Sequence, residues 1–238
     1  MKSLFKSFDF DKKDIDTYFL LLSAPLLLTL YICYGQAKDF TTYFPQYTGH
    51  QLEGYYGQIY QFISFFILMF IIPFLYLKLK MKKPLIEFGF GLGDWKFGLI
   101  ICLITIPFII IPFTYSGTRM SDIQNVYPMA RVLLDRHDLI LQYELVYIIF
   151  YYIAWEFFFR GFLLFGLKDR FGAMNAILIQ TISSCLIHIG KPDGEIIGSI
   201  IFGIIMGVIA IRTKSFWYPL LIHLTMGVLT DIFIIYLK

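Results

Sequence analysis

The second half of the chain is apolar, yet it contains a small set of ionisable side chains: Glu156, Arg160, His188 and His223. A charged side chain costs roughly 2.5 to 3.5 kcal/mol at the centre of a bilayer unless it is paired or faces a polar cavity. Glu156 and Arg160 are four residues apart in WEFFFRG, so on a helix they share a face and can neutralise each other. A structural ion pair would account for these two residues but not for the histidines.

These residue types are suited to hydrolysis of a peptide bond. A desolvated carboxylate can act as a general base toward water, and a histidine can orient that water or donate to a developing oxyanion. The same side chains, Glu156, His188 and His223, could instead ligate zinc through two histidines and one carboxylate. The sequence has no HExxH and no GxSxG segment. A GxGD tetrad ending at Asp94 stands in a basic loop without an aspartate partner, so we assign it no catalytic role.

Composition indicates that a membrane surrounds these residues. The chain is 58% hydrophobic and only 16% charged, with a mean hydropathy of +0.70. Soluble domains contain roughly 25% charged residues. We predict an all-α, polytopic bundle of about seven spanning helices, in which residues 1–238 form a single membrane domain and residues 139–238 carry the polar site. The predicted spans are 18–35, 59–77, 97–115, 139–167, 173–188, 196–211 and 216–236.

Counting along the predicted helices brings the polar residues to one depth. If the chain turns near Gly172, Glu156 and His188 are equally far from that turn and must lie at similar depth, because each residue of a helix rises about 1.5 Å. His223 stands about seven residues into the last helix, roughly 10 Å from the same membrane face, and helix tilt could bring it level with the others. Four such groups converging in apolar surroundings favour a functional site over structural packing.

The distribution of charge favours a multi-pass protein of the cell membrane with its N-terminus in the cytoplasm. Most Lys and Arg residues fall on that side of the predicted spans, including those of the charged segment 1–14. A net charge of +3 with dispersed basic residues predicts the lipid bilayer, and not a nucleic acid, as a partner.

Glutamate, three residues, arginine and glycine on one helix, followed by single histidines on the next helix and the last, resemble the CPBP family. This family contains the CAAX prenyl proteases and the bacterial bacteriocin-processing or Abi proteins. Its signature is EExxxR, FxxxH and HxxxN, and the resemblance covers residues 152–229. It implies an intramembrane endopeptidase acting on a membrane-associated peptide or protein. By analogy, a carboxylate and His188 activate the water and His223 stabilises the oxyanion. The family usually gives the base role to its first glutamate, whereas Glu156 matches the second, which usually pairs with the arginine. We nevertheless expect Glu156 to act as the base, with His188 orienting the water and Arg160 holding the carboxylate.

Three positions depart from the signature. Trp155 replaces the first glutamate, Ser184 replaces the phenylalanine, and Gly227 replaces the asparagine, whose loss removes an oxyanion donor worth about 2.7 to 4 kcal/mol in barrier by analogy. Asp231, one turn after Gly227, is a supporting candidate that could orient a histidine.

Two other classes of function remain open. A catalytically inactive relative would bind a peptide or partner protein in the same cavity, with Trp155 filling the base position. A small transporter would use Glu156 and Asp231 as proton carriers, although no inverted repeat supports that interpretation.

Overall fold

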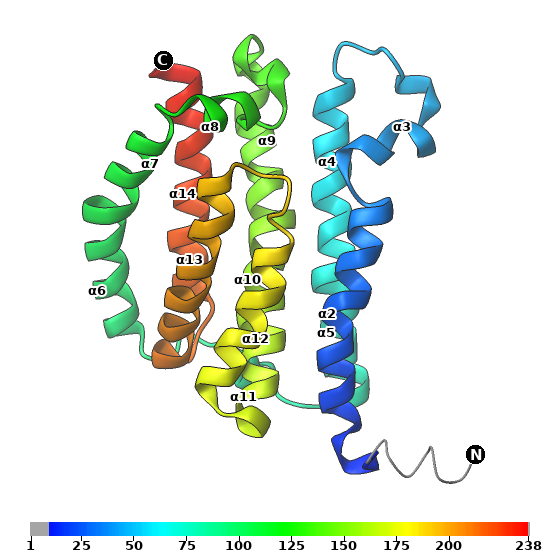
Figure 1. The fold of residues 1–238 in the computed structure, drawn as a ribbon, viewed down its shortest axis with the longest axis vertical. Coiled ribbons are helices and arrows are strands. Elements are labelled where there is room, and N and C mark those ends of the chain that lie inside the picture. The colour runs from blue at the N-terminus through cyan, green and yellow to red at the C-terminus, as the bar shows by residue number, and fades with distance from the viewer. Residues whose placement is uncertain (1–9, 238) are drawn as a thin grey trace.

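The computed structural model describes residues 10–237 and is helical, without a strand in that part of the chain (Figure 1). This confirms the predicted all-α fold of about seven spans. The portion of the charged N-terminal segment before residue 10 lies outside the described residues. Six described helices are long and apolar enough to cross a membrane: Lys12–Tyr34, Glu53–Met81, Trp95–Gly117, His137–Phe171, Asp193–Thr213 and Trp217–Tyr236. A shorter apolar helix, Ala173–Leu186, lies between the fourth and the fifth.

Several of these long helices contain π-helical turns. Such turns join α4 (Glu53–Phe66) to α5 (Ile72–Leu75), and α6 (Trp95–Thr105) to α7 (Ile111–Gly117). Prolines lie in or beside both of these junctions, where their missing N–H removes a regular helical hydrogen bond. The remaining long helices are α2 (Ile15–Tyr34), α13 (Asp193–Thr213) and α14 (Trp217–Tyr236), while α3 (Phe40–Tyr43) and α8 (Ser121–Val126) are short.

The helix His137–Phe171 lies at the centre of the bundle. It comprises α9 (Ile140–Val146), α10 (Ile153–Glu156) and α11 (Gly166–Phe171), and 72% of its most apolar stretch is buried, against 22% to 33% for the other long helices. Figure 1 shows it between α2 and α4 on one side and α13 and α14 on the other. Protein, and not lipid, therefore surrounds the polar residues that this helix carries.

Helices α12 (Ala173–Leu186) and α13 form a hairpin that sets the position of His188. The buried Gln180 side chain of α12 donates to the Gly203 carbonyl of α13 at 3.0 Å. Helix α12 ends at Leu186 and not at residue 188 as expected, because Gly190, with φ +97°, and Pro192 favour a turn over further helix. In Figure 1 this turn lies lower in the view than the upper ends of α9 and α14. His188 thus stands in a turn within the depth of the bundle.

The GxGD tetrad has a structural role. Gly93 adopts φ +51°, and the Thr213 carbonyl occupies the place that a Cβ on residue 93 would take. Asp94 then caps α6 by accepting from the Phe97 N–H at 3.2 Å, and it pairs with Arg212 at 2.7 Å. The Arg212 guanidinium and the Phe97 N–H lower the pKa of Asp94 below its ordinary value. Asp94 is therefore an ionised residue engaged in joining α6 to the end of α13.

Candidate active site

Glu156 is the best-defined group of the site. Its side chain is fully buried, and its Oε1 accepts from His223 Nδ1 at 2.7 Å and from Arg160 Nη1 at 3.2 Å. Its Oε2 has no hydrogen-bond partner among the described residues. One oxygen is therefore fixed by two donors while the other is available to a further donor. The structure thus brings Glu156 together with Arg160 and His223, two of the residues expected to converge on it.

Arg160 is held in an apolar environment. The residue is 1% exposed and lies in a π-helical segment, Phe157–Phe165, every member of which is buried. Its Nε has no partner among residues 10–237. Segments of π-helix are rare and often occur at functional sites. The Glu156–Arg160 pair is therefore almost completely removed from water, which makes each partner dependent on the other.

His188 has a defined tautomer. Its Nδ1 lies 2.6 Å from the carbonyl oxygen of Ser184, one turn earlier at the end of α12. A carbonyl only accepts, so Nδ1 must carry a proton and donate it. In the neutral imidazole, Nε2 is then unprotonated and can accept a hydrogen bond from water. The departure from the family signature at residue 184 does not affect this contact, because the acceptor is a backbone atom.

The Trp155 indole lies next to both imidazoles. Its ring centroid is 5.2 Å from that of His188 and 5.8 Å from that of His223, and both contacts are edge-to-face. Within residues 10–237, His188 makes no direct hydrogen bond to Glu156 or His223. Trp155, itself buried, is thus the contact shared by the two histidines, in the place where the family has a carboxylate.

Gly227 faces a residue that the sequence interpretation missed. A Cβ added to Gly227 would overlap the hydroxyl of Tyr152, which occupies the space of a side chain at this position. The Tyr152 ring also contacts His223, with the centroids 5.0 Å apart. The sequence carried one signal for Tyr152, which lies one helical turn before Glu156 and therefore on the same face.

Asp231 is buried away from the histidines. It makes no hydrogen bond to His188 or His223 in the described part of the chain, so its supporting role stays a prediction. The carboxyl group of Asp231 instead faces that of Glu144 on α9. None of the four carboxylate oxygens of this pair has a hydrogen-bond donor among residues 10–237.

The arrangement gives zinc coordination no support. No group of three or more His, Cys, Asp and Glu side chains in the described residues is placed to hold a metal ion. Glu156 Oε1 and His223 Nδ1 bond each other, and His188 Nδ1 bonds the backbone. The zinc alternative therefore stays a prediction from residue types.

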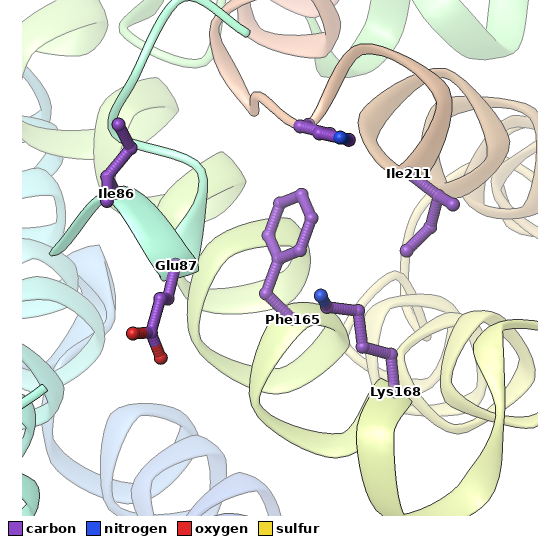
Figure 2. A pocket seen from close by; sticks show the side chains of 6 residues that line it. Ile86, Glu87, Phe165, Lys168 and Ile211 are labelled. Carbon is purple, nitrogen blue, oxygen red and sulfur yellow. The ribbon is translucent and has the colours of Figure 1, made fainter. Parts of the chain in front are cut away.

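A cavity of about 330 Å³ lies elsewhere in the bundle (Figure 2). It is bounded by the loop before α6 and by the ends of α11 and α13. The lining residues are Ile86, Glu87, Phe165, Lys168, Ile211 and Lys214. None of the predicted site residues borders it, so it gives no information on the polar site.

Comparison with known proteins gives a match that falls in the half of the chain that carries the polar site. Residues 139–229 match the family model of Rce1-like proteins, described as type II CAAX prenyl endopeptidase Rce1-like. No curated protein and no solved structure matches the chain. The matched segment contains the glutamate, the arginine and both histidines discussed above, as well as the three departures from the signature. Residues 139–229 of this multi-pass membrane chain therefore resemble the CPBP family, which contains the CAAX-type intramembrane proteases.

Proposed function

We propose that the protein is an intramembrane endopeptidase that hydrolyses a peptide bond of a membrane-associated peptide or protein. The observation that carries the proposal is the state of Glu156. Its carboxylate is buried and anchored through Oε1, while Oε2 has no partner in the described structure. A general base needs such a free, desolvated acceptor held in a fixed direction.

The reaction begins with a water that donates one hydrogen to Glu156 Oε2 and the other to His188 Nε2. Glu156 takes a proton as the water oxygen bonds to the substrate carbonyl carbon, and the carbonyl π electrons move to its oxygen. When this oxyanion collapses, the C–N bond breaks and the departing nitrogen takes the proton from Glu156. The products are a carboxylic acid and an amine, and the Glu156 carboxylate is regenerated.

His223 faces the oxyanion through its second ring nitrogen. Its Nδ1 is engaged with Glu156, so Nε2 is the atom that can reach a substrate. In the imidazolium form Nε2 donates a hydrogen bond, and the Glu156 carboxylate stabilises that positive charge. Arg160 holds Oε1 from the other side, so its charge also lies near the developing oxyanion.

Replacement of His188 by alanine tests its role as the partner of the water. We expect the His188→Ala protein to fold normally and to cleave at least about 100-fold more slowly, because general acid–base partners contribute about 10² to 10⁴ in rate. Purified protein in liposomes would be incubated with a library of membrane peptides, and cleavage followed by mass spectrometry. His137→Ala is the matched control, because His137 is an exposed histidine before α9. Equal cleavage by both variants would contradict the assigned role.

Metal removal separates the water-base mechanism from the zinc alternative. With Glu156 as the base, dialysis against a chelator leaves the cleavage rate unchanged. If zinc were held by Glu156, His188 and His223, the treated protein would lose activity and regain it on addition of Zn²⁺. Metal content measured before and after dialysis shows whether the treatment removed any ion.

A second candidate function is supported by Trp155. A large indole between His188 and His223 occupies the place of a carboxylate and could form the wall of a binding cavity without catalysis. Such a protein would capture a membrane peptide or partner equally well after Glu156→Gln or His188→Ala. Trp155→Ala would weaken capture, and none of the variants would change the size of the bound peptide.

A further inference from the structure

Tyr152 joins the two helices that form the proposed catalytic centre. It lies at the end of the π-helical segment Tyr147–Tyr152, directly before α10, and is 3% exposed. Its ring meets the His223 imidazole nearly at a right angle, at 78° and a centroid separation of 5.0 Å. Because Glu156 follows one turn later, Tyr152 and Glu156 approach His223 from the same helix.

The hydroxyl of Tyr152 points beyond His223 to the next turn of α14. There it lies where a side chain at residue 227 would begin, and only glycine leaves room for it. His223 and Gly227 are four residues apart, so they share the face of α14 that looks toward Glu156. The Tyr152 hydroxyl therefore occupies the space beside His223 that a side chain at residue 227 would otherwise fill.

A phenolic hydroxyl in this place can carry out a specific task. It is a donor without charge, and it sits in a largely apolar site where a hydrogen bond to an anion is stronger than in water. The reaction proposed above creates an oxyanion next to His223. One donor from His223 leaves room for a second, and tyrosine hydroxyls serve in oxyanion holes.

We propose that the Tyr152 hydroxyl donates a hydrogen bond to the substrate oxyanion, together with His223 Nε2. Tyr152 is thus a catalytic residue, provided by the helix facing Gly227. This inference rests on the proposed function, because an oxyanion forms only if a peptide bond is attacked. The site then requires glycine at residue 227, because any side chain there would overlap the Tyr152 hydroxyl.

Tyr152→Phe tests the proposal because it removes only the hydroxyl. We expect kcat to fall by about 10² to 10³, the range for loss of one oxyanion donor, with KM and the melting temperature little changed. A residue that only packs would change the melting temperature or KM instead. Tyr143→Phe is the matched control, because Tyr143 is buried on the same helix and packs edge-to-face on Phe62 of α4 at 5.5 Å, without a ring contact to Tyr152. Its kcat should stay at the wild-type value.

An exchange of positions provides an independent test. Gly227→Asn alone should lose activity, because its side chain would collide with the Tyr152 hydroxyl. Tyr152→Ala alone should lose activity because it lacks the donor. The double variant Tyr152→Ala/Gly227→Asn has space for the amide, and we expect it to cleave at least tenfold faster than Tyr152→Ala. Failure of this rescue in a folded double variant would count against a donor role.

The outcomes distinguish the inference from the function on which it rests. If Tyr152→Phe keeps the wild-type kcat while Glu156→Gln is inactive, Tyr152 is not an oxyanion donor and the peptidase assignment stands. If wild-type Gly227 can be replaced by asparagine without loss, the hydroxyl does not occupy the site as inferred. If the wild-type protein cleaves no membrane peptide, both proposals fail together.

Discussion

Glu156→Gln is expected to abolish peptide cleavage and also to lower the melting temperature, because it leaves the buried Arg160 guanidinium without its counter-charge. Glutamine has the same shape, and its amide oxygen can still accept from His223 and Arg160 where Oε1 does now. Its NH₂ group then takes the place of the free Oε2, and an amide cannot accept a proton from water. We expect the rate to fall by about 10² to 10⁴, the usual contribution of a general base. The liposome assay with mass spectrometry measures this loss.

Glu144→Gln provides a matched control for this substitution. Glu144 is also a buried glutamate on the central helix, but it faces Asp231 and makes no hydrogen bond to either histidine in the described residues. The same substitution of glutamine for glutamate there should leave cleavage near the wild-type rate. Cleavage that persists in Glu156→Gln, or that disappears equally in both variants, would remove Glu156 from the role of base.

The approach of Glu156 to His223 could be predicted only in part, because helix length placed His223 roughly 10 Å into the last helix and left the rest to helix tilt. The rise per residue is nearly constant, so the number of residues from a turn fixes the depth of a side chain in a bundle. The same reasoning placed His188 at a similar depth, and it now stands in the turn after α12. Apolar composition was sufficient to predict the spans, since their length follows from bilayer thickness.

The details around Trp155 and Gly227 could not be obtained in this way. Depth does not determine which direction a side chain faces, and π-helical segments on both sides of α10 change the rotation of the helix relative to a regular α-helix. The contact of the Tyr152 hydroxyl with Gly227 depends on that rotation and on the close approach of α14. From residue types alone, Gly227 only indicates that the asparagine donor is missing. The structure shows the Tyr152 hydroxyl in the space that a side chain at residue 227 would fill.

Arg160→Met is expected to destabilise the protein strongly. Methionine has a similar length but no charge, so the variant would leave the Glu156 carboxylate fully buried with only His223 as a donor. Breaking one partner of a buried ion pair typically costs about 3 to 5 kcal/mol in the free energy of unfolding. Thermal unfolding in detergent should show a clear fall in melting temperature. An unchanged melting temperature would mean that the pair is solvated or dispensable.

The double variant Glu156→Gln/Arg160→Met separates the stability of this pair from its chemistry. Without the carboxylate there is no buried negative charge to compensate, so much of the stability lost in Arg160→Met should return, as expected for directly coupled residues. Cleavage should not return, because the base is absent. If the Glu156–Arg160 pair contributed only to structure, the stable double variant would resemble wild type in every property. Recovered folding without recovered activity instead indicates that the protein keeps this buried pair, despite its cost in stability, because the carboxylate reacts with water.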